Sequence, residues 1–255
     1  MDFFYYPFLA NSGFLNMSID KNLFEETKKY NCVLLRFYLW FPPAVSFGKN
    51  QKVEEIVNIK ECEKNKIDLV RRPTGGRALF HQKELTYFLS GPLDGKIFPK
   101  NFQDNYNLIS NCLLKGFELL KIPVEIKKSK EKYKTSPLNP IPCFSEPAPG
   151  EITFEEKKIV GSAMLVEEEF FLIHGSIIID FDENLNKKIF KKNENFCVAK
   201  LSSILNPLPP WHFILRCFKN GFENFLNKKF SVRNLSKNII EKSISQSSNY
   251  KILKA

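Results

Sequence analysis

Residues 71 to 81 of this 255-residue chain read Arg-Arg-Pro-Thr-Gly-Gly-Arg-Ala-Leu-Phe-His, and the interpretation of the fold depends most on this stretch. The apolar run Ile67–Arg72 predicts a strand that ends at Pro73. Adjacent glycines at 75 and 76 let backbone amides approach a ligand, because no Cβ stands in the way. The neighbouring arginines can bind carboxylate or phosphate oxygens bidentately. A plain hairpin turn is the competing interpretation, and it is the commoner one for Gly-Gly after a strand.

Outward from this motif, hydrophobic periodicity separates helices from strands. We expect helices at 16–30, 53–65, 105–120, 184–191 and 211–226, and strands at 33–40, 44–48, 67–72, 84–90, 151–154, 158–166 and 170–180. Strands dominate the middle of the chain and helices flank them. This pattern predicts an α+β fold with a mixed, largely antiparallel sheet covered by helices. We expect one domain over residues 1–230 and a polar C-terminal extension, with a terminal helix, over residues 231–255.

Composition excludes several classes of protein. Hydrophobic residues make up 43% of the chain, enough to fill a core. The longest apolar runs are strand-sized and the N-terminus lacks the features of a signal peptide, so we expect a cytoplasmic protein with no membrane partner. The six cysteines are scattered and form no CxxC pair, which favours reduced thiols. Three separated histidines are too few to predict a metal site.

The net charge of +10 has three explanations that the sequence leaves open. It can reflect a lysine-rich composition with a solvated surface, which is the simplest explanation. It can also steer an acidic protein partner towards the chain. A nucleic-acid partner is the weakest explanation, since no concentrated basic stripe or recognition motif accompanies the charge.

Two further segments have residues suited to chemistry. Lys158 begins an apolar stretch that continues into Gly161-Ser162-Ala163, and a lysine projecting from such a strand into a cleft is suited to proton transfer. A solvent-facing lysine is the simpler reading. Cys143 lies between prolines on an expected loop, unlike Cys112 and Cys217, which fall on apolar helix faces. A loop thiolate beside a cation is a good nucleophile towards thioesters.

Together these segments resemble the lipoate–protein ligase A and biotin ligase superfamily over about residues 14–205. The matching segments, in chain order, are 16–20, 35–43, 46–48, 71–81, 84–87, 143–144, 158–163 and 174–177. Within the superfamily the chain is similar to the octanoyl-acyl-carrier-protein:protein octanoyltransferases of ligase-like sequence. It has Arg77 where ligases usually have a third glycine, Glu84-Leu85-Thr86-Tyr87 where they have a Leu-Gly-Asn-like run, and the transferase Cys143-Phe144 pair.

The resemblance implies an acyltransferase catalytic domain of the biotin/lipoate ligase type over residues 1–230. The donor would be an octanoyl-loaded acyl carrier protein, and the acceptor a lysine of a lipoyl-domain or glycine-cleavage H-type protein. The catalytic residues would be Cys143, which carries the acyl group as a thioester, and Lys158. The implied substrate-binding residues are Arg72, Thr74, Gly75, Gly76, Arg77, His81, Gly161, Ser162 and Ala163. No cofactor would be required, since the acyl group arrives on phosphopantetheine.

Three alternatives stay open. The chain can be an ATP-dependent lipoate ligase or its large subunit, an amidotransferase that moves lipoyl or octanoyl groups between acceptor proteins, or a noncatalytic module that binds acylated groups. A pure binder would need neither Cys143 nor Lys158. Gln82, Gly150 and Met164 stand where the family usually has Asp, Tyr and Gln, and these departures bear on pocket shape and acyl-chain preference. His174 is expected to be structural.

Overall fold

A computed structural model describes residues 1–127, 150–192 and 196–252 of the chain. Its strands form a large and a small sheet. The large sheet has the order β11 (Ser231–Val232), β1 (Phe3–Asn11), β2 (Val33–Trp40), β6 (Glu84–Pro92), β10 (Phe170–Ile178), β9 (Lys157–Glu167), β8 (Ile152–Phe154) and β7 (Glu125–Ile126). The small sheet has the order β4 (Asp68–Arg71), β3 (Ala44–Phe47) and β5 (Leu79–His81).

The predicted fold class is confirmed. From β2 across to β7 every pairing in the large sheet is antiparallel, while β1 pairs in parallel with both β2 and β11. In the small sheet β3 is parallel to β4 and antiparallel to β5. The expected succession of antiparallel strands at 151–154, 158–166 and 170–180 corresponds to β8, β9 and β10.

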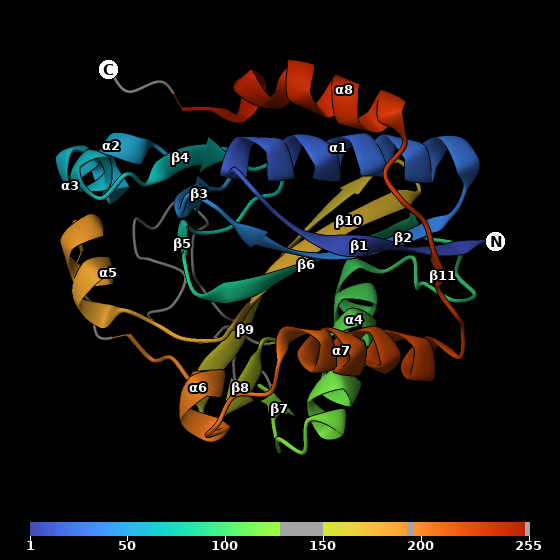
Figure 1. The fold of residues 1–255 in the computed structure, drawn as a ribbon. Coiled ribbons are helices and arrows are strands. Elements are labelled where there is room, and N and C mark those ends of the chain that lie inside the picture. Colours follow the sequence, from blue (N-terminus) through green and yellow to red (C-terminus); the bar gives the residue numbers. More distant parts are fainter. Residues whose placement is uncertain (128–149, 193–195, 253–255) are drawn as a thin grey trace.

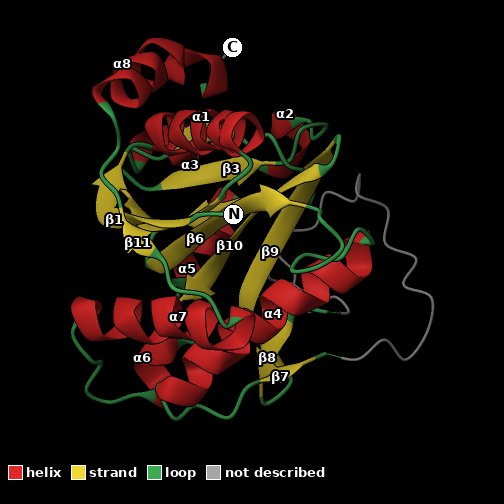
Figure 2. Cartoon of the chain, turned by 90° about the vertical axis from the view of Figure 1, so that its right-hand side faces the viewer, coloured by secondary structure: helices red, strands yellow, loops and turns green. Residues whose placement is uncertain are grey.

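Helices cover both faces of the large sheet (Figure 1). On one face lies α1 (Gly13–Tyr30), with α8 (Lys237–Gln246) outside it; on the other lie α4 (Phe102–Leu119) and α7 (Trp211–Leu226). Figure 2 shows the same layers after a quarter turn. The Ser12 side chain accepts a hydrogen bond from the Leu15 amide and starts α1, and Asn31 ends it in the left-handed conformation. The expected helices at 16–30, 105–120 and 211–226 are confirmed.

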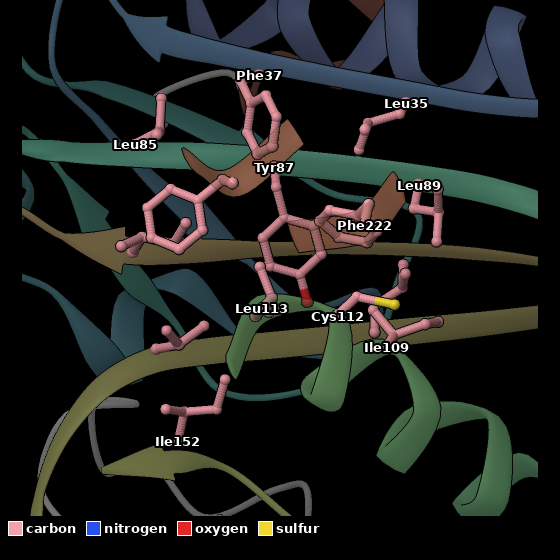
Figure 3. Close-up of a cluster of buried hydrophobic side chains, with 14 of the residues drawn as sticks. Leu35, Phe37, Leu85, Tyr87, Leu89, Ile109, Cys112, Leu113, Ile152 and Phe222 are labelled. Carbon is pink, nitrogen blue, oxygen red and sulfur yellow. The ribbon is translucent and has the colours of Figure 1, made fainter. Parts of the chain in front are cut away.

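The core between the sheet and the α4–α7 layer is built largely from Phe, Leu and Ile side chains (Figure 3). Phe37 and Tyr87 from the sheet lie against Phe222 of α7, with ring centroids 6.4 and 6.2 Å away. Aromatic pairs at such separations add to the burial of their apolar area. This layer packs against one face of the large sheet.

The predicted helix at 53–65 is wrong as one continuous element. It consists of α2 (Val53–Ile56) and α3 (Ile59–Lys64). Between them Val57 forms an isolated bridge with Phe190, and the Asn58 amide donates to the Ile189 carbonyl. These long-range bonds pull the backbone out of the helix, and the Asn58 side chain then caps α3. Together with α5 (Glu183–Ile189), the two short helices cover the small sheet.

Residues in the expected C-terminal extension pack onto the domain. Ser231–Val232 adds to the edge of β1, and α8 lies along α1, where Asn22 donates to the hydroxyl of Ser243 over 3.1 Å. A short 3-10 turn (Ser247–Tyr250) follows α8, and α6 (Leu201–Ile204) precedes α7. In the described ranges no helix combines the length and the apolar character that a bilayer span requires.

Candidate active site

A pocket of about 50 Å³ lies where the small sheet meets β10 and β9 of the large sheet. Its described lining presents mostly carbon and comprises Met17, Tyr38, Trp40, Ser46, Arg72, Gly76, Arg77, Leu79, His81, Thr86, Gly161, Ser162, Ala163, His174, Gly175 and Ser176. The structure therefore gathers most of the predicted substrate-binding residues around one cavity. The exceptions are Thr74, which is buried behind the wall, and Gly75, which lies exposed on the loop.

Arg72 organises the glycine loop. Its guanidinium donates to the carbonyl oxygens of Gly75 and Arg77, both at 2.8 Å, and to the carbonyl and hydroxyl oxygens of Ser46, both at 3.0 Å. The side chain is buried, so these bonds form away from competing water. Arg72 thus joins the loop to the small sheet, a role that the sequence motif did not specify.

Close packing at the loop requires glycine at positions 48 and 76. A Cβ on Gly48 would lie 2.2 Å from the Gly76 carbonyl oxygen, so only glycine permits this approach. Gly76 has φ +88°, a conformation that L side chains rarely adopt, and a Cβ there would lie 3.0 Å from the Arg72 Nη2 atom. A Cβ on Gly75 would meet no atom within 4 Å. The adjacent glycines are therefore not equivalent.

This difference gives a matched prediction for stability. Gly76→Ala is expected to lower the free energy of unfolding by about 1–3 kcal/mol, because it forces a side chain into a strained backbone conformation and against Arg72. Gly75→Ala should change it by less than about 0.5 kcal/mol, as most exposed substitutions do. Urea denaturation of both variants measures the difference. Equal destabilisation would contradict the loop geometry.

His81 stands at the centre of a buried polar network. Its Nδ1 lies 2.9 Å from Glu84 Oε1, and its Nε2 lies 2.7 Å from the Ser46 hydroxyl. Since a carboxylate can only accept, Nδ1 carries the hydrogen and Nε2 accepts from Ser46. The imidazole also stacks on Trp40 with 3.9 Å between ring centroids. Burial lowers the pKa of His81 and outweighs the opposing influence of Glu84, so the ring is neutral at pH 7.

Stability should therefore decrease in mild acid. Below a pH of about 6.5 this histidine is protonated in the unfolded chain, whereas in the folded protein the ring stays neutral to a lower pH. The contribution of the neutral His81 to the free energy of unfolding is lost as pH falls, because the unfolded state then binds more protons than the folded state. We expect the free energy of unfolding to fall between pH 7.5 and 5.5, and to fall less in His81→Gln. The exposed His212→Gln variant is the control, and identical slopes in wild type and His81→Gln would contradict the assignment.

A second buried network supports the loop from the large sheet. The Thr74 hydroxyl lies 2.7 Å from His174 Nε2, and His174 Nδ1 lies 3.3 Å from the Asp20 carboxylate. Asp20 also accepts from the Tyr38 hydroxyl at 2.7 Å. Burial, followed by the nearby Asp20 charge, raises the pKa of Tyr38 well above its usual value, so the phenol stays a donor. His174 links α1 to Thr74 and borders the pocket, which agrees with a structural role.

Lys158 is completely buried, contrary to the simple expectation of a solvent-facing lysine. It lies three residues before Gly161 on β9 and is not among the described residues that line the pocket. Its ammonium forms an ion pair with Glu151, with 2.7 Å between Nζ and Oε1. The pairing of β9 with β8 shifts between Lys158 and Val160, which marks a β-bulge. Bulges re-aim side chains and are frequent beside active sites.

Cys143 and the expected loop around it lie outside the described residues. Among the described cysteines, Cys32, Cys62, Cys112 and Cys217 are buried. Burial raises the pKa of Cys32 to about 11 and also raises that of Cys112 and Cys217, so these thiols remain protonated. The interpretation of Cys112 and Cys217 as core residues is confirmed.

The three departures from the family pattern lie outside the described pocket lining. Gly150 has φ +85°, and its carbonyl accepts from the Ser110 hydroxyl of α4. Met164 packs into the core, where its sulfur lies 3.6 Å from the Asn105 amide nitrogen. Gln82 borders a smaller cavity next to β5.

Sequence reasoning assigned no role to several residues that line the pocket, namely Met17, Tyr38, Trp40, Ser46, Thr86 and Ser176, nor to Glu151, the ion-pair partner of Lys158. On α1 the sequence did contain a signal of buried polar residues near the site. Asn16 and Asp20 are polar residues beside an apolar face, and both are fully buried. Arg36 donates to Asn16 over 2.6 Å. Such partners lie in different segments of the chain, so spacing alone could not pair them.

Comparison with known proteins then identifies the family. Residues 12–220 match the lipoyl protein ligase A/B catalytic domain. The chain belongs to this family. It is 34% identical over 231 residues to Octanoyltransferase LipM of Clostridioides difficile (strain 630), an alignment that covers 90% of this chain and 81% of the relative. This relationship makes the protein an acyltransferase, as predicted.

Solved structures of lipoyl protein ligases share the fold. A lipoate-protein ligase A bound with ATP superposes with a TM-score of 0.80, covering 97% of this chain and 95% of that chain at 17% identity. A bi-partite lipoate protein ligase, studied with its E2 lipoyl domain from Thermoplasma acidophilum, gives a TM-score of 0.77 over 97% and 92% of the two chains, also at 17% identity. At this identity the likeness concerns the fold alone.

Proposed function

We propose that this member of the lipoyl protein ligase A/B family transfers an octanoyl group from acyl carrier protein to a lysine of a lipoyl-accepting protein, through a thioester on Cys143. The observation that carries the proposal is the 34% identity to an octanoyltransferase over 90% of the chain. The mostly carbon lining of the pocket is compatible with an apolar acyl chain. The hydrogen-bonded glycine loop at its edge offers backbone groups for the polar end of such a substrate.

In the first step the Cys143 thiolate attacks the carbonyl carbon of the donor thioester. A new C–S bond forms, the bond to the phosphopantetheine sulfur breaks, and the departing thiolate takes a proton from the Lys158 ammonium. One thioester replaces another, so no nucleotide is consumed. Lys158 is the cation that favours the Cys143 thiolate before the attack.

In the second step the neutral amine of the acceptor lysine attacks the acyl-Cys143 carbonyl carbon. A C–N bond forms, the C–S bond breaks, and Cys143 leaves as a thiolate. The proton lost by the attacking nitrogen moves to the neutral Lys158 amine, which restores the starting ammonium. The sum is a thioester and an amine converted into an amide and a thiol. Backbone amides near Gly76 or Cys143 can stabilise the oxyanion.

The net charge of +10 suits this pair of partners. Carrier proteins and lipoyl-type acceptors are commonly acidic, and opposite charge accelerates encounter. A structural neighbour was studied with its E2 lipoyl domain, which is consistent with a lipoyl-domain acceptor here.

The test is to mix the purified chain with octanoyl-acyl carrier protein and an apo lipoyl domain, without ATP, and to follow intact masses. We expect octanoylated acceptor, with a transient octanoyl adduct on the enzyme. Attachment of free lipoate that requires ATP would instead indicate a ligase. Transfer only from an already acylated acceptor protein would indicate an amidotransferase. Binding without turnover would indicate a noncatalytic module.

A further inference from the structure

Both residues of the ion pair between Lys158 and Glu151 have a hydrogen-bonded backbone. Lys158 donates its amide to the Cys197 carbonyl and accepts from the Ala199 amide, each over 2.9 Å. The Glu151 carbonyl accepts from the Lys127 amide, also over 2.9 Å. Glu151 directly precedes β8 and Lys158 is on β9, and these two strands are joined by a turn in which Glu155 and Glu156 both have positive φ. Each charged side chain therefore extends from a fixed backbone position.

Stability alone does not account for burying this pair. Lys158 is completely buried and Glu151 is 8% exposed. Desolvation of two charges consumes most of their mutual attraction, and apolar residues of similar volume often serve as well or better. The bulge between Lys158 and Val160 adds a local distortion of the strand directly after Lys158. A costly pair on a distorted strand is typical of a site where orientation of a charged group matters.

We propose that Glu151 is a positioning residue for Lys158 in the acyl-transfer reaction. Its carboxylate accepts from the Lys158 ammonium and fixes the position of Nζ. This inference rests on the proposed function, because Glu151 has this role only if Lys158 donates and accepts protons during acyl transfer. Neither the motifs nor the family resemblance had assigned Glu151 a role.

A positioning role affects rate more than substrate affinity. A misplacement of about 1 Å can reduce a rate by about 100-fold. In Glu151→Gln the amide still accepts a hydrogen bond but has no charge, and we expect transfer from pre-formed acyl-enzyme to slow by about 10- to 100-fold with an unchanged KM for the acceptor. In Glu151→Asp the charge stays but is withdrawn by one methylene, and we expect about a fivefold loss. Glu125→Gln on neighbouring β7, an exposed glutamate outside the site, is the matched control.

A double-mutant cycle separates positioning from a general structural effect. If Glu151 acts through Lys158, Glu151→Gln should cause no further loss of rate in a Lys158→Met background. Additive losses would overturn the proposal, as would a wild-type transfer rate in Glu151→Gln or a loss confined to KM. If Glu151→Gln fails to fold, Glu151→Asp decides, and a wild-type rate in that variant overturns the proposal.

The wild-type protein in the same assay separates this inference from the proposed function. No octanoyl adduct on wild-type Cys143 would remove the proposed function, and the role of Glu151 with it. A normal wild-type adduct and normal transfer, together with an unimpaired Glu151→Gln variant, would remove only the inference about Glu151.

Discussion

Cys143→Ala is expected to abolish octanoyl transfer, with a loss on the order of 10⁴-fold or more, as when an enzyme loses its nucleophile. Without the sulfur no acyl-enzyme can form, and the acceptor amine would have to attack the carrier-protein thioester directly. Mass spectrometry of the variant after incubation with octanoyl-acyl carrier protein should show no adduct. Acceptor modification should fall below detection in the same mixture.

Cys197→Ala is the appropriate control for this substitution. Cys197 is the partly exposed cysteine in the described part of the chain, and its sulfur lies 3.8 Å from the Glu156 carbonyl oxygen. Its replacement should leave both the adduct and the turnover intact. Turnover by Cys143→Ala close to that of wild type would exclude the covalent route, whatever adduct the wild type forms.

Lys158→Met is expected to reduce transfer by about 100-fold or more, the usual contribution of a positioned proton-transfer group. The methionine keeps most of the apolar stem but removes the ammonium. It also removes the Lys158 partner of the buried Glu151 carboxylate, so the free energy of unfolding should fall by about 3 kcal/mol. Rates must therefore be measured at a temperature where circular dichroism shows the variant to be folded.

Lys157→Met tests whether the effect belongs to position 158. Lys157 is the preceding residue on the same strand and is exposed. Its replacement removes the same charge from the chain but no buried ion pair, so rate and stability should stay near those of wild type. Near-normal turnover by a folded Lys158→Met variant would make Lys158 a bystander and would leave proton transfer to another group.

The fold was predictable where local pattern and tertiary context agree. The helical pattern of 211–226 and the apolar, strand-sized run of 33–40 predicted α7 and β2 correctly to the residue. The prediction failed where long-range hydrogen bonds determine the backbone conformation. At Val57 and Asn58 such bonds divide the helix expected at 53–65 into two. Phe3–Asn11 was not predicted as a strand, because its aromatic residues show no clear period and its pairing partner β2 lies on the far side of α1 in the chain.

By itself, the sequence determined the fold class, the family resemblance and the set of residues around the glycine loop, because these depend on residue types at short spacings. Only the tertiary structure decided what those residues do. It shows that Arg72 donates to loop carbonyls, that a Cβ is tolerated at Gly75 but not at Gly76, and that Glu151 forms an ion pair with Lys158. The physical reason is that burial, backbone conformation and charge pairing arise from contacts between segments, and no local pattern contains them.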